Sequence, residues 1–208
     1  QRGMKILIIS YFFPPYNAMG AIRVGKTAKY LTRLGHDVRV VSAADQPLQS
    51  TAPLEIEPER VRYTRWLNVN APVMFALGGR SRVAATGYTT APGRLGRLAR
   101  GLGRVYKQLT NLPDGEIGWL RPARAAALEL AREWRPDLIY ASGLPMTALI
   151  VAHQVSRRTG IPWVAEMRDL ITDEPWYAQP RWRRGPRDRR QKARRRRALD
   201  DRWCPGRD

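Results

Sequence analysis

Gly20 to Thr27 match the spacing of a phosphate-binding loop, with a glycine, four other residues and then Gly-Lys-Thr. In such a loop the backbone N–H groups surround phosphate oxygens at a helix start, the lysine contacts the terminal phosphates and the threonine holds magnesium. The context differs here, because residues 11–19 separate Gly20 from the preceding apolar run. Val24 also fits the apolar stripe of a helix, which would place Lys26 in mid-helix. We therefore expect a helix, with a nucleotide-binding loop as the alternative.

Polar residues also follow three predicted strands, in the segments 10–20, 142–145 and 168–173. Because ligands of open parallel sheets bind beyond the carboxyl ends of the strands, we expect these three loops to converge on one cleft. Arg168 and Asp169 lie at one of these strand ends, where Asp169 is placed to accept hydrogen bonds from ligand hydroxyl groups. The alternative for this pair is a salt bridge or a helix N-cap.

Histidine and cysteine offer little chemistry in this chain. His36 and His153 have no Ser, Cys or Asp partner at a spacing visible in the sequence, so we expect structural roles for both. The single cysteine, Cys204, excludes an internal disulfide framework and fits a reducing compartment. Two histidines and one cysteine are too few for a structural zinc site, and we expect no metal and no bound cofactor.

The elements that must position these residues follow from hydrophobic periodicity. Residues 5–10 form a continuous apolar run that predicts a strand buried on both faces of a parallel sheet. A helical apolar stripe starts at Ala21 and a second strand follows, which makes a βαβ unit. Further predicted elements are a strand at 61–66, a helix at 123–134, a strand at 138–141, a helix at 146–158 and a strand at 162–167. The predicted fold class is α/β, a Rossmann-like parallel sheet flanked by helices.

Composition and charge exclude some classes of protein and leave others open. The 208 residues are 43% hydrophobic, which excludes disorder throughout, and no apolar run approaches the roughly 20 residues of a membrane-spanning helix. The net charge is +19, and residues 181–208 hold thirteen Arg or Lys against four Asp. We expect this tail to be disordered alone, either as a basic arm for nucleic acid or lipid or as the product of a shifted reading frame. Residues 94–109 form a basic amphipathic stripe, which predicts either an anionic membrane contact or an ordinary surface helix.

Several motifs together resemble a known family. Residues 4–10, Phe13-Pro14-Pro15, Gly20, Arg23 and Leu34–Val38 resemble the opening of a family 4 glycosyltransferase of the GT-B fold. Residues 136–142 and 160–169 resemble later strands of the same N-terminal domain, and the similarity runs from about residue 4 to 180. The resemblance implies transfer of a sugar from a nucleotide-sugar to an acceptor, often a lipid-linked saccharide, with retention of configuration. It implies that the N-terminal domain contacts the acceptor while a C-terminal domain holds the nucleotide.

The resemblance also suggests residue roles. Pro15, Gly20, Arg23, Ser142 and Gly143 are the expected substrate-binding residues, with Arg23 able to stabilise a phosphate. Arg168 and Asp169 are the expected catalytic pair. Glu166 and Glu174 have the spacing of the paired glutamates of retaining sugar transferases. Because that pair belongs to the second domain, and Glu166 lies in a strand with core neighbours, we expect a coincidence.

The predicted organisation is an acceptor-side domain over residues 4–180, a tail over 181–208 and no donor-binding domain. We therefore expect the chain to be inactive by itself. The expected location is the cytoplasm, with peripheral contact to the inner face of the plasma membrane and a role in polysaccharide biosynthesis of the cell envelope. Nucleic acid is expected to bind only non-specifically, through residues 181–208.

Overall fold

The computed structural model describes residues 3–69 and 114–167, which form a layered α/β domain built on one parallel sheet. The five strands are β1 (Lys5–Ile9), β2 (Asp37–Ala43), β3 (Val61–Thr64), β4 (Leu138–Ser142) and β5 (Trp163–Glu166). The helices are α1 (Met19–Arg33), α5 (Leu120–Trp134) and α6 (Met146–Thr159), with short 3-10 helices η1 (Pro58–Arg60) and η2 (Ile117–Trp119). Among these residues, no helix is long and apolar enough to span a membrane.

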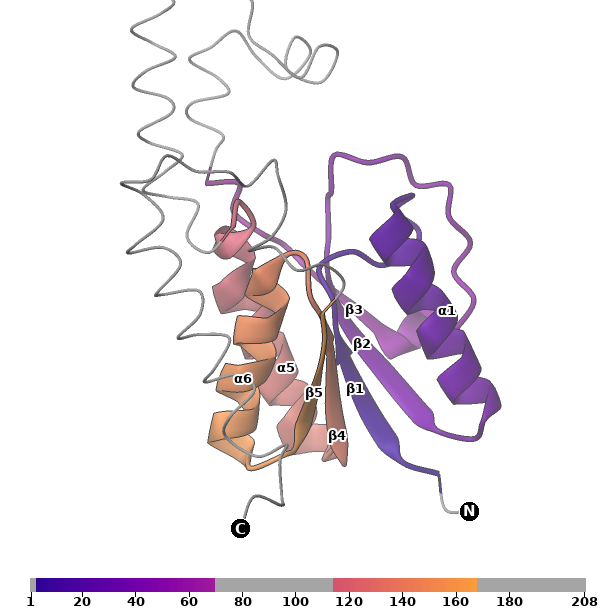
Figure 1. Cartoon of the computed structure of the whole chain (residues 1–208), viewed down its shortest axis with the longest axis vertical. Coiled ribbons are helices and arrows are strands. Elements are labelled where there is room, and N and C mark those ends of the chain that lie inside the picture. The colour runs from indigo at the N-terminus through magenta and orange to yellow at the C-terminus, as the bar shows by residue number, and fades with distance from the viewer. Residues whose placement is uncertain (1–2, 70–113, 168–208) are drawn as a thin grey trace, which may run out of the picture.

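The strand order is β3-β2-β1-β4-β5, with β1 in the centre. Ile8 of β1 pairs in parallel register with Val40 of β2 on one side and with Tyr140 of β4 on the other. A central strand is covered on both faces, which explains why β1 is a continuous apolar run without alternation. Figure 1 shows α1 on one side of the sheet, and α5 and α6 on the other.

Alternate residues of the strands point to the two helical layers. Ile6 and Ile8 face α1 and pack with Val24 and Ala28, both fully buried. Gly25 of the same helix lies against Pro14, and an added Cβ would come within 2.7 Å of the Pro14 ring. The absence of a side chain at residue 25 thus lets the loop after β1 lie directly on α1.

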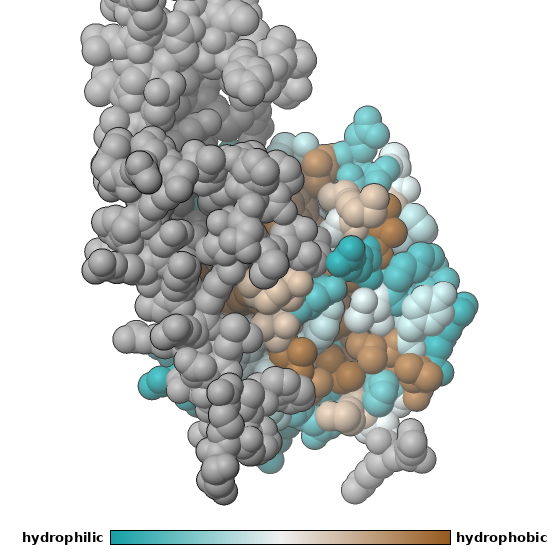
Figure 2. All heavy atoms as spheres, viewed as in Figure 1, coloured by the Kyte–Doolittle hydropathy of each residue, from teal (hydrophilic) through white to brown (hydrophobic). Residues whose placement is uncertain are grey.

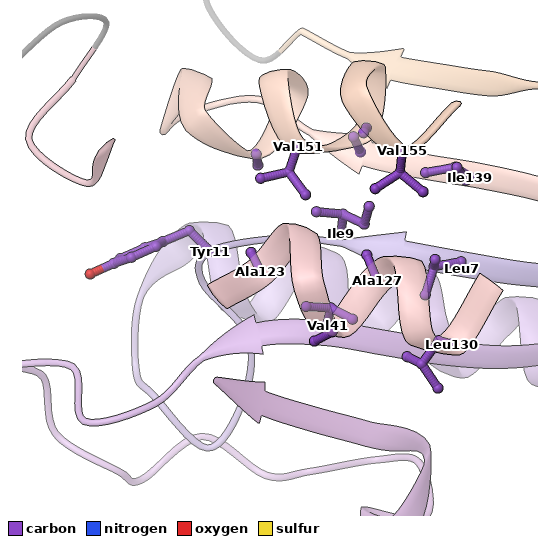
Figure 3. Packing of buried hydrophobic residues seen from close by; sticks show 14 of the residues in the cluster. Leu7, Ile9, Tyr11, Val41, Ala123, Ala127, Leu130, Ile139, Val151 and Val155 are labelled. Carbon is purple, nitrogen blue, oxygen red and sulfur yellow. The ribbon is translucent and has the colours of Figure 1, made fainter. Parts of the chain in front are cut away.

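The opposite face of the sheet carries the larger core. Leu7 and Ile9 point between α5 and α6, where they meet Ala127 and Val151 (Figure 3). Tyr11 lies beyond the end of β1, and its ring stands edge-on to the rings of Phe12, Trp66 and Trp119 at centroid distances of 5.0, 5.6 and 5.4 Å. These aromatic rings close the end of the core at the carboxyl edge of the sheet.

The predicted fold class is confirmed, and most predicted elements are present at nearly their expected bounds. The helix predicted from Ala123 begins earlier, at Leu120, with Pro122 in its first turn. Proline is tolerated there because the first backbone N–H groups of a helix have no intrahelical acceptor. The predicted segments 94–109 and 181–208 lie outside the described residues, as do Arg168 and Asp169.

Candidate functional site

The sheet has a topological switch point between β1 and β4. From β1 the chain passes through α1 to β2 on one side, whereas from β4 it passes through α6 to β5 on the other. The loops after β1 and β4 therefore turn to opposite faces of the sheet (Figure 1). Open α/β sheets bind their ligands in a crevice at such a switch point, beyond the carboxyl ends of the strands.

Three side chains from three different elements meet beside this crevice. The Ser142 hydroxyl at the end of β4 donates a hydrogen bond to Glu166 Oε2 at the end of β5, with an O–O distance of 2.6 Å. The guanidinium of Arg23, in the second turn of α1, lies 3.7 Å from the other Glu166 oxygen. The Ser142 side chain is fully buried, whereas that of Arg23 is 53% exposed. A cation and a carboxylate thus face one another at the carboxyl ends of the strands.

The loop that follows Ser142 has an unusual backbone. The Gly143 N–H donates to the Glu166 carbonyl at 2.8 Å, and a Cβ on Gly143 would lie 3.0 Å from that oxygen and 3.2 Å from a methyl group of Leu149. Leu144 has φ of +68°, in the left-handed region that residues with a bulky side chain rarely adopt. Such backbone strain persists only where surrounding contacts enforce it, and it concentrates at functional sites.

The outer face of α1 is basic, and part of its charge is already paired. Lys26 and Lys29 both contact the Glu55 carboxylate, and these two hydrogen bonds hold the pKa of Glu55 below its usual value. Exposed apolar residues such as Met19 and Tyr30 stand on the same helix. Figure 2 shows this mixture of hydrophilic and hydrophobic side chains on the described part of the face. In the two described segments, no group of three or more His, Cys, Asp or Glu side chains is arranged to hold a metal ion.

A second polar cluster lies on the opposite face, at the N-terminus of α6. The Asp114 carboxylate accepts the Thr147 backbone N–H at 2.8 Å and the Thr147 hydroxyl at 2.6 Å, so it caps this helix from a distant part of the chain. Burial raises the pKa of Asp114, and burial together with the Asp114 charge raises the pKa of Glu116 to about 7. Burial and these two carboxylates raise the pKa of Tyr11 as well. Sequence reasoning missed this cluster, whose only local signal is the Asp114-Gly115 turn.

The structure brings together some of the predicted site residues. Arg23 and Ser142 contact Glu166 through their side chains, and Gly143 does so through its backbone N–H. Pro15 contacts a different part of the molecule, because its carbonyl accepts the N–H of Ala52.

Two further expectations concern Gly20 and Glu166. Gly20 is buried within the first turn of α1 rather than lying in the preceding loop. Glu166 lies in a strand, as expected, at the end of β5, and its side chain is 25% exposed and contacts both Ser142 and Arg23. Its position at the end of the strand, two residues before Arg168, was the signal available in the sequence.

The structure does not support the phosphate-loop alternative. Gly20 to Thr27 all lie within α1, so from Ile22 onward their backbone N–H groups bond to carbonyls one turn earlier instead of surrounding a ligand. Lys26 binds Glu55, and the Thr27 hydroxyl donates to the Arg23 carbonyl one turn earlier. Val24 of this segment is fully buried against the sheet, which is why the helical pattern prevails over the motif.

We therefore expect ATP with magnesium not to bind through Lys26. In a calorimetric titration, the original chain and Lys26→Ala should behave alike, and Lys29→Ala is the matched control because Lys29 contacts the same carboxylate. Saturable, magnesium-dependent ATP binding that is lost only in K26A would restore the phosphate-loop function.

The comparison with protein families agrees with this architecture. The model of the glycosyl transferase 4-like domain matches residues 20–204, which is most of the chain. The chain belongs to the glycosyl transferase 4-like domain family. The family 4 resemblance of the motifs is thereby confirmed, and Arg23, Ser142 and Glu166 lie within the matched part of this glycosyltransferase-family domain.

Solved structures are similar to this chain only at low identity and with low TM-scores. The C-terminal domain of the PF1911 hydrogenase from Pyrococcus furiosus is 16% identical over 80% of this chain and 93% of that one, with a TM-score of 0.42. The glycosyltransferase SsfS6 from Streptomyces sp. SF2575, solved with thymidine diphosphate, is 21% identical over 78% of this chain, with a TM-score of 0.36. This glycosyltransferase 4-like domain spans 38% of the SsfS6 chain. No curated protein matches this chain.

Proposed function

We propose that this domain binds the acceptor of a retaining glycosyl transfer, in the crevice between the carboxyl ends of β1 and β4. The observation that carries the proposal is the meeting of Arg23, Ser142 and Glu166 at the switch point of the sheet. Carboxylate and hydroxyl oxygens bind the hydroxyl groups of a saccharide, and a guanidinium binds phosphate. Membership of the glycosyl transferase 4-like family supports sugar transfer as the reaction that the site serves.

The acceptor we propose is a lipid-linked saccharide that carries phosphate or diphosphate. Arg23 is half-exposed, and its only ion pair among the described residues is the long contact to Glu166. An exposed ion pair of this kind contributes little, so an incoming phosphate competes for the guanidinium at small cost. The N-terminus of α1 has no acidic residue in its first turn, and its helix dipole favours negative charge nearby.

The rest of the proposed function concerns the donor and the membrane. We propose that the nucleotide-sugar is bound mainly outside these 208 residues, so that the chain alone does not transfer sugar. Holding donor and acceptor in reactive geometry can supply about 7–11 kcal/mol of barrier lowering, and a site that binds the acceptor alone lacks this contribution. We propose Arg168 and Asp169 as the catalytic pair, and residues 94–109 as the contact to an anionic membrane at the inner face of the plasma membrane.

The test is a binding series on the 208-residue chain, followed by NMR titration. Hexose 1-phosphates represent the phosphorylated acceptor, and a panel of UDP-, GDP- and TDP-sugars represents the donor. We expect the sugar phosphates to bind, and Arg23→Met to weaken them about tenfold because the cation that holds the phosphate is lost. The control is Lys26→Met, which removes a charge from the same helix away from Glu166.

Two results would contradict this function. Micromolar binding of a nucleotide-sugar, or its turnover by the chain alone, would assign the donor site to these residues. Failure of every sugar phosphate and free hexose to bind would show that the crevice does not take the acceptor.

A further inference from the structure

We propose that Glu166 is a specificity-determining residue of this site: its carboxylate accepts a hydrogen bond from a saccharide hydroxyl group beside a phosphate held by Arg23. The inference rests on the proposed acceptor function and adds a residue and a ligand class to it. The ligand is a sugar phosphate that carries a hydroxyl donor and an anionic group close together. Glu166 then distinguishes such a ligand from phosphate or pyrophosphate alone.

The first argument is that the carboxylate is held in one orientation. The buried Ser142 hydroxyl donates to Glu166 Oε2 at 2.6 Å, and Glu166 lies opposite Ser142 in the β4–β5 register. The Gly143 N–H holds the backbone of Glu166 through its carbonyl. A carboxylate fixed by its neighbours loses little rotamer freedom when a ligand binds, which favours selective recognition.

The second argument is that Oε1 is only loosely engaged. A charge-assisted N–H···O hydrogen bond has a donor–acceptor distance of about 2.7–2.9 Å, whereas Arg23 stands 3.7 Å from Oε1. A carboxylate oxygen has two acceptor positions, so a hydroxyl group can bind Oε1 even while Arg23 remains nearby. The side chain is 25% exposed, which leaves it accessible from the crevice.

The third argument is the combination of opposite charges. A ligand with both a hydroxyl and a phosphate satisfies Glu166 and Arg23 together, and it separates an ion pair of little strength. Pyrophosphate alone meets Arg23 but is repelled by the adjacent carboxylate. A free hexose uses Glu166 but leaves Arg23 without an anion. The pair therefore favours sugar phosphates over either component.

A different role, in which Glu166 merely positions Arg23, predicts another pattern. In that case removing the carboxylate charge would weaken pyrophosphate and sugar phosphates alike, as loss of Arg23 does. Direct hydroxyl binding predicts that only ligands with the hydroxyl are weakened. Pyrophosphate affinity therefore separates a substrate contact from a positioning role.

The experiment is an NMR titration of the 208-residue chain with glucose 1-phosphate, galactose 1-phosphate, N-acetylglucosamine 1-phosphate and inorganic pyrophosphate. Glu166→Gln should weaken the best sugar phosphate about fivefold, because a charged acceptor becomes neutral, and should leave pyrophosphate unchanged or tighter. Arg23→Met should weaken both kinds of ligand. Glu55→Gln, which removes a carboxylate that also contacts α1 cations, should change neither.

Deoxy analogues of the best sugar phosphate, each lacking one hydroxyl group, identify the hydroxyl group that donates a hydrogen bond to Glu166. One analogue should bind the original chain about fivefold more weakly, and E166Q should weaken that analogue no further, because the two changes remove the same hydrogen bond. If E166Q shifts the thermal midpoint strongly, Ser142→Ala is the second variant. This variant keeps the Glu166 carboxylate but removes the hydrogen bond that orients it. We therefore expect a smaller loss of affinity, confined to sugar phosphates.

The outcomes separate this inference from the function on which it rests. If sugar phosphates bind the original chain but E166Q leaves them unchanged, or weakens pyrophosphate equally, the inference is overturned and the acceptor site stands. If no sugar phosphate or hexose binds the original chain, both are overturned.

Discussion

Trp119→Ala should lower the free energy of unfolding by about 3–5 kcal/mol, the usual cost of truncating a large buried aromatic side chain. Trp119 is fully buried at the end of η2, and its ring stands edge-on to Tyr11 at 5.4 Å. Its indole N–H donates to the Thr64 hydroxyl at 2.8 Å, which links η2, directly before α5, to the end of β3. Urea denaturation followed by far-UV circular dichroism measures the loss.

Trp119→Phe is the matched variant for this prediction. It keeps an aromatic ring against Tyr11 but loses the hydrogen bond to Thr64 and part of the volume, so a smaller loss is expected. A loss below about 1 kcal/mol in Trp119→Ala would mean that this ring does not hold the two layers together.

Glu116→Gln should stabilise the protein by about 2–3 kcal/mol at pH 8 and leave its stability unchanged near pH 4. Burial and the Asp114 charge raise the pKa of Glu116 from 4.5 to about 7 in the folded chain. The unfolded chain therefore releases this proton at lower pH, so ionisation destabilises the fold progressively between about pH 4.5 and pH 8. Glutamine is neutral at every pH, so the variant loses the part of the pH dependence of stability that Glu116 causes.

Thermal unfolding between pH 4 and pH 8 tests this prediction. Glu55→Gln is the control, because the pKa of Glu55 is lowered by Lys26 and Lys29, so its removal should not stabilise the protein at pH 8. Equal midpoints for the original chain and E116Q at every pH would show that the Glu116 carboxyl is not buried in solution.

The elements around β1 could be predicted from local patterns. The apolar run over 5–10 and the helical stripe with Val24 and Ala28 predicted β1 and α1, because burial on two faces and on one face leave different periodicities. The same periodicity rejected the phosphate-loop motif correctly, since Val24 is fully buried against the sheet. Bounds were less exact at the start of α5, where Pro122 stands in the first turn of the helix.

The candidate site was predicted only in part. Arg23, Ser142 and Gly143 were identified from their places after strands and in the first helix, and they do meet at the switch point. Glu166 was set aside, because in the sequence it stands within an apolar strand and shares a misleading spacing with Glu174. Its contacts come from β4 and from α1, which the sequence places far from it.

The sequence by itself determined which segments are strands and helices and which ends of them carry polar groups, because periodicity is a property of neighbouring residues. Only the tertiary structure decided that β4 lies beside β1, that Ser142 stands opposite Glu166, and that Asp114 reaches the start of α6. Strand order depends on how whole layers bury their apolar faces, and similar apolar patterns are compatible with several orders. The contacts that make the crevice a site therefore follow from the packing of distant segments.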